Sequence, residues 1–129
     1  MPLLSLLLDP KWRKLRLTLA IAMYLTILVA GSIPGARAEI GRYATGATLH
    51  SLAYAVLAFL WFTSTSGSRS VCAVKAVLAV AAMGAGDEFV QSFFPYRGAA
   101  VGDWLVDCSA AVVTTAVLWA VLPRPATAR

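Results

Sequence analysis

Apolar residues occupy four long stretches of the chain, separated by short segments that are polar or contain glycine and proline. The stretches cover about residues 15–33, 44–63, 71–94 and 101–122. A helix that crosses a bilayer needs about 20 predominantly apolar residues, and each stretch is close to that length. The pattern therefore predicts an all-α membrane protein, a bundle of four transmembrane helices.

A basic segment, residues 1–16, precedes the first apolar stretch. Its charged residues are typical of an interfacial anchor on the cytoplasmic side of a membrane, and they are Lys11, Arg13, Lys14 and Arg16. We expect residues 17–122 to form one transmembrane domain and residues 123–129 to form a cytoplasmic tail.

The beginning of the chain also allows a second interpretation. A basic region, an apolar core and the sequence Ala36-Arg37-Ala38 are together typical of a cleavable signal peptide. The apolar core is longer than in most signal peptides, and further apolar stretches follow it. The length therefore favours a retained first helix.

Composition supports a membrane protein and argues against a nucleic-acid partner. Of the 129 residues, 60% are hydrophobic and 13% are charged, whereas about 25% are charged in ordinary soluble domains. The net charge of +5 comes from basic residues that lie mainly at the ends of the apolar stretches, where topology signals belong. We expect the partner to be the lipid bilayer and the location to be the cell (cytoplasmic) membrane, with several passes.

The positive charges predict an orientation. Cytoplasmic loops of membrane proteins carry an excess of Lys and Arg. With a cytoplasmic N-terminus, most of the chain's 11 Lys and Arg residues lie inside, and the outer side carries only Arg37, Arg42 and Arg97. Four spans then place both termini inside, an N-in/C-in topology.

In this topology, polar residues of three helices fall at one depth. At ~1.5 Å per residue they lie within roughly 10 Å of the outer interface. Several are spaced i,i+4 or i,i+3 and so share a helix face. The sequence predicts a polar pocket on the outer side, roofed by residues 95–97 and lined by His50, Tyr54, Asp87, Glu88, Gln91, Asp103 and Asp107.

These residue types suit acid–base chemistry and anion binding. The candidate catalytic residues are Glu88, Asp103 and His50, each a type that transfers protons. The candidate ligand-binding residues begin with Arg97, whose planar guanidinium suits a phosphate or carboxylate, and include Gln91, Asp87, Asp107 and Tyr54.

No cofactor is evident from the sequence, and whether the protein is an enzyme stays open. A divalent cation would find oxygen ligands in Glu88, Asp103 and Asp107. A structural interpretation stands beside each of these roles, because buried polar pairs can serve helix packing without chemistry.

The same residues resemble the VanZ-like membrane proteins, a family named for a teicoplanin-resistance protein. The family pattern is a His followed four residues later by Tyr, then D-E-x-x-Q-x-F-x-P-x-R, then an Asp followed four residues later by a polar residue, usually Asn. The chain matches it with His50 and Tyr54, with residues 87–97, and with Asp103. It departs at Asp107, where Asn is usual, and at residues 46–47, where the family often has Asp-Lys. The resemblance implies a bacterial, multi-pass cell-envelope protein linked to glycopeptide resistance.

Three functional hypotheses follow. The first is a VanZ-like protein that binds or modifies an anionic envelope component, such as a lipid-linked wall precursor, or a glycopeptide-type ligand at the outer leaflet. The second is a non-enzymatic scaffold or partner subunit whose polar cluster only fixes helix packing; the sequence does not identify its protein partner. An ion-coupled transporter is weaker, because no charged path reaches the cytoplasmic half.

Overall fold

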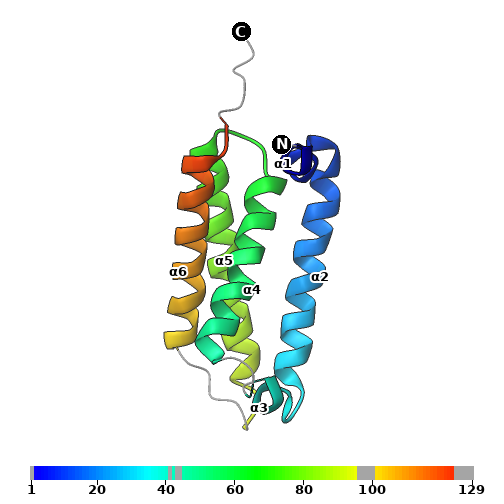
Figure 1. Ribbon diagram of the computed structural model, residues 1–129. Helices are drawn as coiled ribbons and strands as arrows, with labels where there is room; N and C mark the ends of the chain where they lie inside the picture. The colour runs from blue at the N-terminus through cyan, green and yellow to red at the C-terminus, as the bar shows by residue number, and fades with distance from the viewer. Residues whose placement is uncertain (1, 41, 43–44, 96–100, 124–129) are drawn as a thin grey trace.

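Four long helices run alternately up and down in a bundle (Figure 1). The computed structural model describes residues 2–40, 42, 45–95 and 101–123 of the chain. The long helices are α2 (Arg13–Ser32), α4 (Gly46–Ser64), α5 (Arg69–Gln91) and α6 (Val101–Val121). The short ones are α1 (Pro2–Leu8), the 3-10 helix η1 (Pro10–Trp12) and α3 (Ala36–Ile40). The described part of the chain contains no strand.

All four long helices, the first counted together with η1, are long and apolar enough to cross a membrane. This confirms the predicted all-α fold with four candidate spans. The third helix ends earlier than predicted, at Gln91 rather than at residue 94. Phe93 and Phe94 belong to a turn in which their amides donate to Val90 and Gln91. Pro95 disfavours a helical conformation of the residue before it, which explains the early end.

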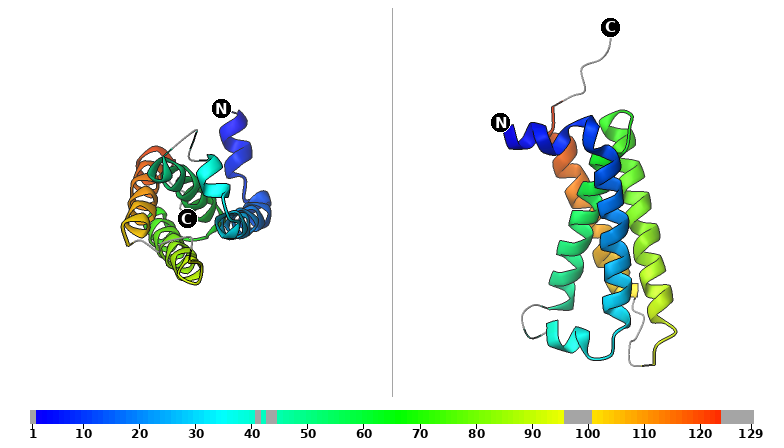
Figure 2. Two further views of the ribbon diagram at one scale, coloured as in Figure 1. Left: turned by 90° about the horizontal axis from the view of Figure 1, so that it is seen from below. Right: turned by 90° about the vertical axis from the view of Figure 1, so that its right-hand side faces the viewer.

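Small residues and a few large ones, such as Leu57 and Phe62, fill the helix interfaces, while many other large apolar residues face outward. Helix α6 packs against α4 and α5, and α2 packs mainly against α4 and also against α5 (Figure 2). Buried positions include Ala20, Ala58, Val80 and Ala111, as expected where helix backbones approach closely inside a membrane. Leucines and valines are exposed along every long helix, so the outer surface of the bundle suits lipid.

Arginine side chains close the C-terminal ends of two helices. The last four carbonyl groups of a helix have no partner within it. Arg16 is 5% exposed, and its Nη2 donates to the Thr63 carbonyl at the end of α4 over 2.8 Å. Arg69 donates to the carbonyls of Trp119 and Leu122 at the end of α6. Both contacts lie at the end of the bundle that carries α1, so this end is basic and ordered.

Candidate functional site

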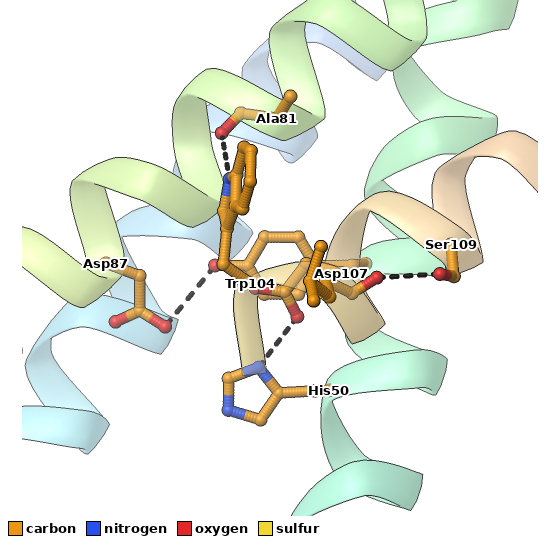
Figure 3. A network of polar contacts seen from close by, with 8 residues as sticks. His50, Ala81, Asp87, Trp104, Asp107 and Ser109 are labelled. Carbon is orange, nitrogen blue, oxygen red and sulfur yellow. Dashed lines mark hydrogen bonds and ion pairs between the residues drawn. The ribbon is translucent and has the colours of Figure 1, made fainter. Parts of the chain in front are cut away.

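Polar side chains of α4, α5 and α6 meet between these helices (Figure 3). Tyr54, Asp87, Gln91 and Asp107 are buried. His50 is half-buried. The four-helix topology brings these residues together because α4 and α6 begin, and α5 ends, at the same end of the bundle. The structure thus brings five of the predicted pocket residues close together.

The shortest contact of the cluster joins α4 to α6. His50 Nδ1 lies 2.7 Å from Asp107 Oδ1, and the Asp107 side chain is completely buried while that of His50 is 12% exposed. Burying a carboxylate is costly unless it is hydrogen-bonded or paired. The imidazole offsets part of that cost. The second oxygen, Asp107 Oδ2, is buried and has no hydrogen-bond partner in the described part of the chain.

A second contact joins α4 to α5. The Tyr54 hydroxyl donates to Asp87 Oδ2 over 3.4 Å. The rings of His50 and Tyr54 are stacked, with centroids 5.9 Å apart and planes inclined by 2°, as the i,i+4 spacing allows. One face of α4 thus supplies partners to carboxylates on two of its neighbours, α5 and α6.

The close approach of α6 to α5 depends on Gly84. A Cβ atom at residue 84 would lie 3.0 Å from Asp107 Oδ2 and 3.1 Å from Cδ1 of Trp104. Trp104 also donates through Nε1 to the Ala81 carbonyl over 2.9 Å. Glycine therefore leaves the space in which Asp107 and Trp104 sit against α5.

Helix α2 reaches the same region through one hydroxyl group. Tyr24 donates to the Met83 carbonyl over 2.9 Å, and a Cβ at residue 86 would lie 2.5 Å from that hydroxyl. Tyr24, Trp104, Gly84 and Gly86 were not among the site residues predicted from the sequence. Glycines inside an otherwise helical apolar stretch often have a packing reason, so Gly84 and Gly86 were the available signal.

The predicted residues differ in how the structure places them. His50, Asp107, Tyr54 and Asp87 are linked by the contacts above. Gln91 is buried two turns from Gly84 on the same side of α5. Half-buried side chains near them are Glu88 and Asp103. Arg97, the predicted anion-binding residue, lies outside the described residues, as does Tyr96 of the predicted roof.

The carboxylates Glu88, Asp103 and Asp107 are the metal ligands predicted from the sequence. Within residues 2–40, 42, 45–95 and 101–123, no group of three or more His, Cys, Asp or Glu side chains is arranged to hold a metal ion.

A groove opens on the outer surface of the bundle beside the His50–Asp107 pair. It has a volume of about 530 Å³ and is lined by Ser51 and Ala55 of α4 and by Leu105, Ser109 and Val113 of α6, among others. Ser51 directly follows His50 in the chain. The groove is mostly apolar and lies within the candidate spans.

The arrangement is suited to proton transfer by His50. With Asp107 ionised, Nδ1 carries the proton that the carboxylate accepts, and Nε2 keeps its lone pair; this assignment follows from the partner. A buried carboxylate that orients an imidazole in this way stabilises the imidazolium formed when Nε2 takes a proton. No hydrogen bond reaches Nε2 from the residues that the structure describes, and Figure 3 shows the second ring nitrogen directed away from Asp107.

Comparison of the sequence with models of known protein families, with curated proteins and with solved structures found no match.

Proposed function

We propose that the chain is a VanZ-like, multi-pass protein of the cell membrane that binds or modifies an anionic envelope component or glycopeptide-type ligand at the outer leaflet. The observation that carries the proposal is the contact of 2.7 Å between His50 and a completely buried Asp107. A hydrogen-bonded imidazole with a second nitrogen left for a ligand is a recurrent arrangement for general base catalysis.

The motif that suggested the family is also the part of the chain that assembles the cluster. His50 and Tyr54 of the first motif element contact Asp107 and Asp87 of the later elements. Residues separated by more than 30 positions thus act on one another in space. This supports treating the motif as one site.

Charge supports placing the site at the outer leaflet. The end of the bundle with α1 carries the cations of residues 11–16 together with Arg69 and Lys75. An excess of Lys and Arg is typical of the cytoplasmic side. The cluster near the opposite end would then face outward, and the topology would be N-in/C-in.

In the proposed mechanism each part of the site has one task. Arg97 holds the anionic group of the ligand, since a guanidinium can make two parallel hydrogen bonds to a phosphate or carboxylate. His50 takes or supplies a proton, oriented by Asp107. The groove between α4 and α6 accommodates an apolar part of an amphiphilic ligand.

The test is ligand-dependent stability of the purified protein in neutral detergent. We expect a pyrophosphate-linked lipid to raise the melting temperature of the wild type in a saturable way, because a ligand that binds only the folded state stabilises it by mass action. Arg97→Ala should lower the apparent affinity for this lipid. His50→Gln should leave binding intact and remove the effect of the protein on envelope drug susceptibility.

The matched control is Arg42→Ala, which removes an exposed arginine from the segment between α2 and α4. It should behave as the wild type in every assay. If no anionic envelope lipid or glycopeptide shifts the wild-type melting temperature, or if Arg97→Ala has the same apparent affinity as the wild type, the proposal is wrong.

A non-enzymatic scaffold is the second candidate, and one observation favours it. The contacts of His50 and Tyr54 join α4 to α6 and to α5, which is also what a purely structural cluster would do. This candidate expects His50→Gln and Asp107→Asn to melt earlier and to reach the membrane at lower levels. It expects no effect of ligand in any variant.

A further inference from the structure

We propose that α1, η1 and the first turn of α2 form a binding site for anionic phospholipid headgroups in the leaflet at their end of the bundle. The site is separate from the His50–Asp107 cluster, which lies toward the other end of the helices, and it does not depend on the function proposed above.

The first step of the argument is that this segment has a defined position. Arg16 Nη1 donates to the carbonyls of Leu7 over 2.7 Å and of Asp9 over 3.1 Å, while its Nη2 donates to Thr63 of α4. One buried guanidinium thus joins the end of α1, the turn after it and the end of α4. The segment is held against the bundle before any lipid binds.

The second step concerns the apolar side chains of α1. Leu3, Leu4 and Leu7 are 74%, 46% and 50% exposed, and the helix projects sideways from the end of the bundle (Figure 2). A short apolar helix that lies beside membrane spans is expected to rest in the interface between headgroups and acyl chains. Its leucines would then contact lipid rather than water.

The third step concerns charge. Lys11, Arg13 and Lys14 follow α1 directly and are all exposed. Trp12, between them, is 39% exposed, and Lys11 Nζ lies 5.2 Å from the centre of its ring. Tryptophan is enriched at the headgroup level of membranes. Clusters of basic residues next to a span attract anionic lipids.

These features together favour a phospholipid over a soluble anion. A free phosphate would contact only the cations, whereas an anionic phospholipid fits both the cations and the neighbouring leucines. The charge is complementary because Asp9 is the one acidic residue among residues 1–16, and its carboxylate accepts a hydrogen bond from the Lys11 amide.

The experiment compares three additives to the full-length protein in neutral detergent: phosphatidylglycerol, phosphatidylcholine and inorganic phosphate. We expect phosphatidylglycerol alone to raise the melting temperature in a saturable way. In the variant K11Q/R13Q/K14Q the apparent affinity for phosphatidylglycerol should fall by about tenfold or more, with an unchanged melting temperature before lipid is added. High salt should weaken the effect in the wild type, since exposed charges are screened.

Two further variants separate the parts of the site. R42Q removes an exposed cation from the segment between α2 and α4 and should keep the wild-type response. L3S/L4S keeps every cation and should bind phosphatidylglycerol more weakly than the wild type. An equal response to phosphatidylcholine or to inorganic phosphate would overturn the proposal, as would a triple variant that still responds as the wild type does.

Discussion

Gly84 of α5 lies directly against side chains of α6. The side chains that occupy the space beside it are Asp107, which is fully buried, and Trp104, which is held by the Ala81 carbonyl. Both side chains are held in place: Asp107 is hydrogen-bonded to His50, and Trp104 is hydrogen-bonded to the backbone of α5. The polar cluster therefore depends on a position that has no side chain.

At the scale of single residues, we predict that Gly84→Ala lowers the free energy of unfolding by about 1–3 kcal/mol, the usual cost of overpacking a core. The added Cβ would lie 3.0 Å from Asp107 Oδ2 and 3.1 Å from Trp104 Cδ1. Denaturation in mixed micelles measures the change. Gly102→Ala is the control, because a Cβ there meets nothing within 4 Å and alanine favours a helix over glycine by up to ~1 kcal/mol. Equal effects of the two substitutions would contradict this account of Gly84.

At the scale of elements, the ends of the helices explain how the basic side of the bundle is built. Cations near a helix C-terminus interact favourably with its dipole. Arg16 supplies this interaction to α4, and Arg69 supplies it to α6. Arg69 also lies over the ring of Trp119, 4.8 Å from its centre. Two of the cations from which the sequence predicts the orientation thus also stabilise helix ends.

We predict that Arg16→Met destabilises the bundle by about 1–3 kcal/mol, because it leaves buried carbonyl groups without a donor. The methionine preserves most of the apolar stem, so the loss isolates the guanidinium. Denaturation in mixed micelles again gives the change. Arg13→Met, at an exposed position in the same helix, should differ little from the wild type. If the two variants were equally stable, the contacts of Arg16 would contribute nothing measurable.

At the scale of the whole molecule, the alternation of four helices places the segment before α4 and the segment after it at opposite ends. Arg42 and Ser66 represent these two segments, and both are exposed. The distribution of cations between the ends gives each segment a side of the membrane in the proposed topology.

The orientation of the chain can be tested by labelling single cysteines. They are introduced into a variant in which the two native cysteines, Cys72 and Cys108, are replaced by alanine. A membrane-impermeant maleimide should label Arg42→Cys in spheroplasts, because this residue lies on the outer side in an N-in topology. Ser66→Cys should be labelled only after the membrane is permeabilised. The reverse pattern would show an N-out protein, and labelling of both sites in sealed spheroplasts would exclude a single fixed orientation.

The four helices could be predicted from the sequence because a membrane span depends on a local property, an apolar stretch of about 20 residues. The error at the end of α5 has the same origin. Phe93 and Phe94 extend the apolar stretch, but the turn before Pro95 ends the helix at Gln91. Apolar character alone does not distinguish a residue in a helix from an apolar residue in the turn that follows it.

That the polar residues of α4, α5 and α6 lie at one level of the bundle could likewise be predicted from the sequence, because it follows from counting residues along helices of alternating direction. Their pairing was decided only by the tertiary structure. His50 contacts Asp107, and Tyr54 contacts Asp87, because of how each helix is rotated and how closely its neighbours approach. Those rotations result from packing at positions such as Gly84 and Gly86, where α6 and α2 meet α5. Packing brings together residues that are far apart in the chain, so these contacts cannot be predicted from a local pattern of the sequence.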